Sequence, residues 1–221
     1  MYEQPQLLII AGPNGAGKST VSRDFAPQNA FIFDPDKERA KIDVRFPDLP
    51  NDSIDYALNQ FFFDCVESAL SDRKDFVLET NFRDSGLMDT VKRFQDSGYA
   101  ANMIYLVLTG VPQSIDRVKK RVSNGGHFVD NESIRFNYTE GLKNLNYFAE
   151  RFDNLEIIDS SGSLLQLRSL LSVQEKQIVF HSADLPQWIE QEIIDIAHRF
   201  KDNTKQLDNN EERSRPRGPS R

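Results

Sequence analysis

The chain has 221 residues, a net charge of −7 and 38% hydrophobic residues, including 16 Phe. This composition is typical of a globular protein with a sizeable core, and it excludes collagen-like and compositionally disordered chains. The one cysteine, Cys65, excludes a disulfide framework within the chain and favours a reducing compartment, the cytoplasm. The start of the chain lacks a signal-peptide pattern, and no apolar run is long enough to span a membrane.

The charge is distributed unevenly. Residues 201–221 carry six basic and four acidic side chains, so the chain before them has a net charge of −9. Affinity for nucleic acid depends on Lys and Arg side chains that neutralise phosphates, so this acidic body argues against nucleic acid as a partner. We expect small ligands instead, bound where cations are concentrated locally.

Short apolar runs alternate with segments of helical spacing along most of the chain. The runs predict strands over residues 6–11, 30–33, 76–78, 103–108, 155–158 and 177–180. Helical spacing predicts helices over residues 19–25, from about 37 onward, and over 52–70, 112–122, 131–148 and 185–200. This order predicts an α/β fold of three layers with a mostly parallel central sheet. We expect one domain over residues 1–200, followed by a disordered, basic-ended tail over 201–221.

A phosphate-binding loop follows the first predicted strand. Residues 12–19 fit G-x-x-x-x-G-K-[ST], in which glycines let backbone N–H groups curl around an anion at a helix N-terminus. Lys18 is expected to reach the β- and γ-phosphates of ATP, and the Ser19 hydroxyl is expected to ligate Mg²⁺. The predicted nucleotide-binding residues are Gly12, Pro13, Asn14, Gly15, Ala16, Gly17, Lys18, Ser19 and Thr20.

Three classes of protein use such a loop. A GTPase needs a guanine-reading N-K-x-D motif, which is absent from the sequence. A mechanical ATPase would have an apolar strand that ends in Asp-Glu, whereas the predicted strands here end differently. The sequence therefore favours a kinase.

Acidic residues follow two of the predicted strands, where a parallel sheet places its ligand site. Asp34 and Asp36 come after the strand over 30–33, and Glu79, Thr80 and Asn81 come after the strand over 76–78, so all are expected to face the phosphate loop. Asp36 is the predicted general base for an acceptor hydroxyl. Asp34 is assigned to the metal, whereas Glu79 serves the metal or the acceptor, and Thr80 contacts the acceptor. Alternatively, Asp34 and Asp36 only form a turn and cap the following helix.

Basic residues flank a Gly125–Gly126 break and predict an arginine lid. Arg121 and Arg135 lie on either side of the break, where mobile arginines could close over the transferring phosphoryl group. His127 is assigned to loop ordering or substrate contact rather than to a metal. Three nearby basic residues are instead predicted to form a solvated helix face: Arg117, Lys119 and Lys120.

These motifs together resemble the zeta-toxin-like P-loop kinases, in particular small stand-alone bacterial members. The resemblance covers roughly residues 7–200 and rests on four elements in order: GPNGAGKS at 12–19, FDPD at 33–36, LET at 78–80, and RVSNGGHFV at 121–129 leading to Arg135. It implies a P-loop kinase fold with a helical lid. It also implies the same roles for Lys18, Ser19, Asp36 and Arg121 as those inferred above.

The resemblance implies an ATP- and Mg²⁺-dependent kinase acting on a hydroxyl of a small metabolite. Known members phosphorylate a UDP-amino sugar, so UDP-N-acetylglucosamine is a candidate acceptor, and an antitoxin-like protein is a candidate partner. The chain departs from those toxins because Lys37-Glu38-Arg39 replaces the usual aromatic residue after the second acid. The alternatives are a nucleotide or polynucleotide kinase and a non-catalytic ATP-binding switch.

Overall fold

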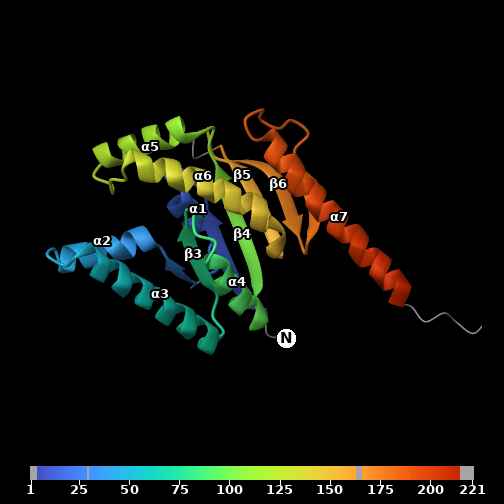
Figure 1. Ribbon diagram of the computed structural model, residues 1–221, viewed down its shortest axis with the longest axis horizontal. Helices are drawn as coiled ribbons and strands as arrows, with labels where there is room; N and C mark the ends of the chain where they lie inside the picture. Colours follow the sequence, from blue (N-terminus) through green and yellow to red (C-terminus); the bar gives the residue numbers. More distant parts are fainter. Residues whose placement is uncertain (1–3, 29, 163–165, 215–221) are drawn as a thin grey trace, which may run out of the picture.

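The structure is a computed structural model that describes residues 4–28, 30–162 and 166–214. Its strands form one sheet with the order β2-β3-β1-β4-β5-β6-β7 (Figure 1). The first five strands run parallel, whereas β6 pairs antiparallel with both β5 and β7. The strands are β1 Gln6–Ala11, β2 Phe31–Phe33, β3 Phe76–Thr80, β4 Ala100–Val107, β5 Asn154–Asp159, β6 Arg168–Gln174 and β7 Gln177–His181.

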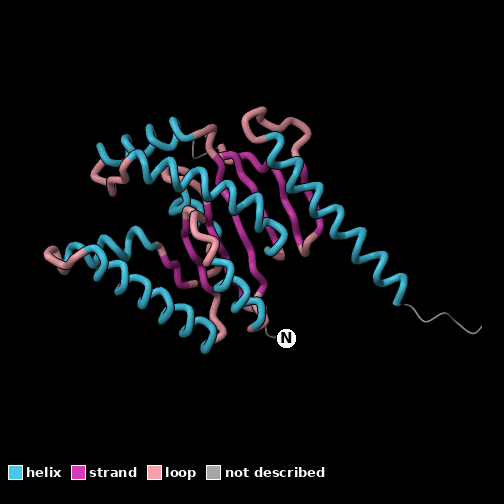
Figure 2. Tube along the Cα trace, viewed as in Figure 1, coloured by secondary structure: helices cyan, strands magenta, loops and turns pink. Residues whose placement is uncertain are grey.

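Helices flank the sheet on both faces, so the predicted layered α/β architecture is confirmed (Figure 2). The helices are α1 Lys18–Phe25, α2 Pro35–Arg45, α3 Asn51–Asp72, α4 Leu87–Asp96, α5 Val111–Ser123, α6 Asn131–Phe148, the short 3₁₀ helix η1 Ala149–Arg151, and α7 Glu190–Ser214. Within the described part of the chain, no helix is both long and apolar enough to cross a membrane.

Alternating side chains of the central strands enter two separate cores. Leu7 and Ile9 of β1 pack with α3, α4, α6 and α7 on one face of the sheet. Leu8 and Ile10 point to the opposite face, where Val21 of α1 joins them. This period of two fixes β1 in the middle of the sheet, because a slip of one residue would exchange the two faces.

Strand β1 lies at the topological switch point of the sheet, with β2 and β3 on one side of it and β4 and β5 on the other. Its neighbours are β3 on one side and β4 on the other, and both pairings are parallel. In open α/β sheets the ligand site forms beyond the carboxyl end of such a strand. The turn that follows Ala11 is therefore the expected position for a ligand.

The chain differs from the prediction mainly near its C-terminal end. Helix α7 continues to Ser214, so it includes residues 201–214 of the tail that the sequence predicts to be disordered (Figure 1). Between 201 and 214 the sequence has neither Gly nor Pro, so nothing in it breaks a helix that packed residues have started. Residues 215–221 of the predicted tail lie outside the described residues. Helix α4 and strand β6 were also missed, and α7 begins five residues later than expected.

Candidate active site

The loop between β1 and α1 requires glycine at two points. A Cβ atom at Gly12, whose φ is +140°, would lie 2.4 Å from the Leu106 carbonyl oxygen. A Cβ atom at Gly15, whose φ is +80°, would lie 2.8 Å from Cβ of Arg117. Both positions combine left-handed backbone with close packing, so larger residues would push the loop out of place.

The Lys18 ammonium folds back onto this loop. Its Nζ donates to the carbonyl oxygens of Gly12 at 2.8 Å and Pro13 at 3.2 Å, and to Oδ1 of Asn81 at 2.8 Å. Burial lowers the pKa of Lys18 to about 8, although nearby carboxylates, Asp36 first among them, oppose the shift. The half-buried ammonium hydrogen-bonds only neutral groups here, which leaves it suited to an incoming anion.

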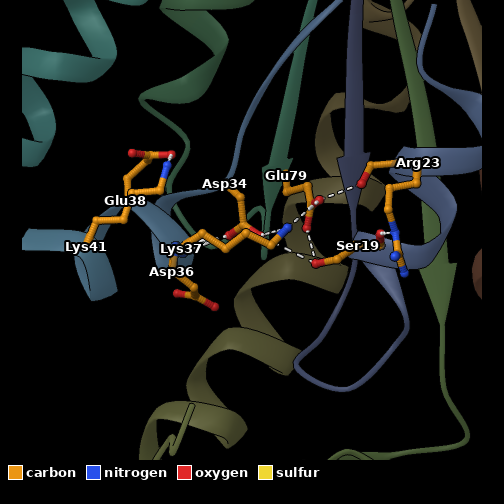
Figure 3. A network of polar contacts seen from close by, with 9 residues as sticks. Ser19, Arg23, Asp34, Asp36, Lys37, Glu38, Lys41 and Glu79 are labelled. Carbon is orange, nitrogen blue, oxygen red and sulfur yellow. Dashed lines mark hydrogen bonds and ion pairs between the residues drawn. The ribbon is translucent and has the colours of Figure 1, made fainter. Parts of the chain in front are cut away.

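Three side-chain oxygens meet where α1 faces the ends of β2 and β3 (Figure 3). Ser19 Oγ donates to Oε2 of Glu79 at 2.7 Å and lies 3.4 Å from Oδ2 of Asp34. Ser22 Oγ donates to the other Glu79 oxygen, Oε1, at 2.5 Å. Both carboxylates are buried, with Asp34 7% and Glu79 3% exposed. The serines thus fix the Glu79 carboxylate on the side of the phosphate loop.

This oxygen set fits Mg²⁺. Within the described residues, no group of three or more His, Cys, Asp or Glu side chains could hold a metal ion. Magnesium does not need such a group, because it commonly binds through one or two carboxylates and substrate phosphates and keeps several waters. Ser19, Asp34 and Glu79 supply hard oxygen ligands of that kind beside the phosphate loop.

Asp34 also begins helix α2. Its Oδ1 accepts from the backbone N–H groups of Asp36 at 3.1 Å and Lys37 at 3.3 Å, as an N-cap side chain does. Its Oδ2 lies 2.8 Å from Nζ of Lys37. Burial alone would raise the pKa of Asp34, but the hydrogen bond and charge of Lys37 hold it below the usual value. The helix-cap interpretation of Asp34 therefore describes one carboxylate oxygen, and the other faces Ser19.

Asp36 and Thr80 line the same cleft, which has a volume of about 1590 Å³. The Asp36 side chain is exposed and points away from Glu79 and Ser19 (Figure 3). Thr80 Oγ1 accepts from the backbone N–H of Phe82 at 2.9 Å. Thr20 and His127, also predicted from the sequence, line the cleft as well.

Arg121 reaches the cleft from the end of α5. Its Nη2 donates to the backbone carbonyl of His127 at 2.8 Å, and its Nε is buried without a hydrogen-bond partner. A Cβ atom at Gly126 would lie 2.5 Å from Cγ of Arg121, so the loop closes on this side chain only because residue 126 is glycine. The Arg121 charge also lowers the pKa of Lys18, which means that the two cations share one region. An unpaired buried guanidinium nitrogen is costly unless a ligand completes it.

The other predicted lid arginine is placed differently. Arg135 is exposed and is not among the residues that line the cleft. Arg117, assigned from the sequence to a solvated face, instead donates to the carbonyls of Gly15 at 3.3 Å, Ser161 at 2.9 Å and Gly162 at 2.7 Å. The interpretation of Arg117 was wrong because the fold brings α5 against the phosphate loop, which sequence spacing does not reveal.

Sequence reasoning also missed a chain of polar contacts between the phosphate loop and α6. Asn137 Nδ2 donates to Oδ1 of Asn14 at 2.8 Å, and Arg83 Nη1 donates to Oδ1 of Asn137 at 3.1 Å. Arg83 lines the cleft, as does Asn81, which holds Lys18. Asn81 directly follows Thr80, and its place after the strand already predicts that it faces the phosphate loop. Asn137 carried a weaker signal, because it is a polar residue inside the apolar stripe of its helix.

Comparison with solved structures and curated proteins gives relatives of low identity. The chain is similar to a protein from the PezAT toxin–antitoxin system of Streptococcus pneumoniae, with 14% identity and a TM-score of 0.57 over 91% of this chain and 87% of that one. It is also similar to a chain of the AvrRxo1-ORF1:AvrRxo1-ORF2 complex with ATP, with 11% identity and a TM-score of 0.60 over 90% of this chain and 76% of that one. An uncharacterised protein of Haemophilus influenzae is 24% identical over 136 residues, which are 61% of this chain and 94% of that protein.

These structural likenesses concern the fold alone. The family is shown by a direct match, since the family model described as zeta toxin matches residues 1–170. That match covers the phosphate loop, both acidic segments and the loop around Arg121. The chain therefore belongs to the zeta toxin family.

Proposed function

We propose that this protein is an ATP- and Mg²⁺-dependent kinase that transfers the γ-phosphate to a hydroxyl of a small metabolite. One observation carries the proposal. A single cleft is lined by the phosphate loop and, across from it, by acidic residues that follow β2 and β3, including Asp36. A nucleotide-binding switch would need the loop, whereas transfer also needs a carboxylate that faces an acceptor.

On the ATP side, the backbone of residues 12–19 cradles the phosphates, and Lys18 exchanges its neutral partners for phosphate oxygens. Arg121 brings its unpaired Nε to the γ-phosphoryl group, where negative charge spreads in the transition state. Ser19 and Asp34 would hold Mg²⁺, which when bound would neutralise phosphate charge. Glu79 belongs to this side as well, because Ser19 and Ser22 engage both of its oxygens.

On the acceptor side, Asp36 orients the hydroxyl and accepts its proton. The hydroxyl oxygen forms a bond to the γ-phosphorus, the bond from that phosphorus to the β–γ bridging oxygen breaks, and ADP leaves. Thr80 and His127 are the proposed acceptor contacts. Arg135 would need a movement of the lid to join them, and Arg83 is already in the cleft.

The acceptor is proposed to be a small metabolite, with UDP-N-acetylglucosamine as the first candidate because the chain belongs to the zeta toxin family. The PezAT structure concerns a toxin–antitoxin system and the AvrRxo1 structure is a complex of ORF1 with ORF2, which supports an antitoxin-like protein as a proposed partner. The cytoplasm is the proposed compartment because the chain has one cysteine. A polynucleotide acceptor is disfavoured by the acidic body of the protein.

A substrate panel tests this proposal. Purified protein with ATP and Mg²⁺ is incubated with UDP-N-acetylglucosamine, with nucleosides or with a short oligonucleotide, and ADP release is measured. We expect ADP release that depends on one small-molecule acceptor and falls at least about 100-fold in Asp36→Asn. Release that depends on the oligonucleotide alone would reject the small-metabolite acceptor. Tight ATP binding with no ADP release from any acceptor or cell extract would favour the switch.

A further inference from the structure

A lysine side chain reaches into the oxygen cluster assigned to Mg²⁺. Lys37 lies in the first turn of α2, and its Nζ is 2.8 Å from Oδ2 of Asp34 and 3.7 Å from Oε1 of Glu79. Ser19 Oγ donates to Oε2 of Glu79 at 2.7 Å and lies 3.4 Å from Oδ2 of Asp34. One ammonium thus sits against the two buried acids beside the phosphate-loop serine (Figure 3).

The Lys37 side chain reaches this cluster from solvent. It is 58% exposed, whereas the side chains of its partners Asp34 and Glu79 are 11% and 3% exposed. The long stem can therefore swing out without opening the core, but the two acids cannot follow it. Two buried carboxylates left without a cation would repel each other and lack solvation, so a cation or a bound proton between them stabilises the pair.

We propose that Lys37 is a tethered substitute for the divalent metal: it neutralises Asp34 and Glu79 in the nucleotide-free protein and leaves when Mg²⁺ enters with ATP. The inference rests on the proposed function, since it concerns the same metal site. Its consequence is that free metal binds weakly, whereas metal that arrives with nucleotide binds well. The site would then assemble only around the metal–nucleotide complex.

The electrostatics favour this exchange. A divalent ion bound to Oδ2 of Asp34 would lie close to the Lys37 ammonium, and like charges about 4 Å apart repel even in a polarisable site. Free metal must therefore displace Lys37 from both carboxylates, and the displaced ammonium gains only water. Metal bound to ATP brings negative phosphates, which also give the displaced ammonium a new partner.

A change in pH would not release Lys37. Burial lowers its pKa, but the hydrogen bond to Asp34 and the charges of Glu79 and Asp34 outweigh burial and raise the pKa above the ordinary lysine value. Arg23 is a nearby cation that opposes this effect. The side chain therefore stays charged at neutral pH, and only a competing cation can take its place.

The alternative is an ordinary capping ion pair with no connection to metal binding. Lys37 and Asp34 are three residues apart at the start of α2, where such pairs are common and contribute little. Lys41 and Glu38 form a similar pair at 2.7 Å one turn further along the same helix. Glu38 makes no contact with Ser19 or Glu79 among the interactions of the described residues, so Lys41 offers a matched control.

The test is a titration of the nucleotide-free, full-length protein with Mn²⁺, in which free Mn²⁺ is followed by electron paramagnetic resonance. We expect Lys37→Met to bind Mn²⁺ at least about tenfold more tightly than the wild type, because one opposing charge is removed. Lys41→Met should bind like the wild type, and Lys37→Arg should remain weak because the charge is kept. The gain should disappear when Lys37→Met is combined with Glu79→Gln.

Equal Mn²⁺ affinity in Lys37→Met, Lys41→Met and wild type would overturn the proposal, as would a gain that persists without the Glu79 charge. If Lys37→Met unfolds, Lys37→Gln serves as a second variant, and Mn²⁺ should raise its melting temperature more than that of the wild type. The titration uses neither ATP nor an acceptor. Tighter Mn²⁺ binding without any kinase activity would leave this inference standing and reject the proposed function alone.

Discussion

The nucleotide-free protein should take up protons when it binds ATP, because Lys18 is partly neutral in the empty site. Burial lowers the pKa of Lys18 from 10.5 to about 8. Phosphate oxygens favour the charged form, so the pKa should return above about 10 in the complex. At pH 8.5 about three quarters of the free protein then lacks this proton, and binding should take up about 0.7 proton per ATP.

Isothermal titration calorimetry with ATP and Mg²⁺ measures this uptake, through the dependence of the binding enthalpy on the ionisation enthalpy of the buffer. The same linkage predicts that ATP affinity falls roughly 30-fold between pH 7 and pH 9.5, since ever less of the free protein carries the charge. Lys18→Met should bind more weakly and show no uptake at pH 8.5. If the wild type gave the same binding enthalpy at pH 8.5 in two buffers of different ionisation enthalpy, the reasoning about Lys18 would be refuted.

Three further changes test other parts of the site. Gly126→Ala should lower kcat at least about tenfold with little change in ATP affinity, because the new Cβ would meet Arg121 Cγ; unchanged kcat in steady-state assays would contradict this. Gly12→Ala should abolish ATP binding and destabilise the protein by about 2 kcal/mol or more in urea unfolding, because the alanine Cβ would collide with the Leu106 carbonyl oxygen. Normal ATP binding by this variant would contradict the loop geometry. The lowered pKa of Asp34 contributes stability that is present above about pH 4 and is lost as the pH falls further. In urea unfolding, Asp34→Asn should therefore lose less stability than the wild type between pH 5 and pH 2. Parallel curves of unfolding free energy against pH would exclude that contribution.

Much of the fold follows from local patterns. Runs such as residues 6–11 are apolar throughout because a central parallel strand is buried on both faces. Strand β6 escaped prediction because it is antiparallel and sits near the edge, where buried Leu170, Leu171 and Val173 are interrupted by serines. The sequence did not predict the extension of α7 beyond residue 200, for a different reason. Its last turns consist of polar residues that suit either a helix or a disordered tail, and only the packed start at Ile193 and Phe200 commits the chain to a helix.

The sequence predicted the parts of the site that depend on a contiguous backbone pattern. The prediction failed for the parts that depend on contacts between elements far apart in the chain. The phosphate loop is a contiguous pattern, and Asp34 and Glu79 follow strands, so sequence located them. Arg117 and Asn137 reach the loop from α5 and α6, more than 100 residues away. No local pattern records such contacts. Their role became visible only when the helices were placed against the sheet.

The most direct test of the central claim is transfer of ³²P from γ-labelled ATP to a small molecule in a metabolite extract. With Mg²⁺ present, the wild type should give one dominant labelled product that is lost on treatment with phosphatase. Lys18→Ala and Asp36→Asn should each abolish it, whereas Lys41→Met, which changes a lysine outside the acidic cluster of the site, should not. Labelling that survives both site variants, or no labelled product from the wild type, would contradict the account.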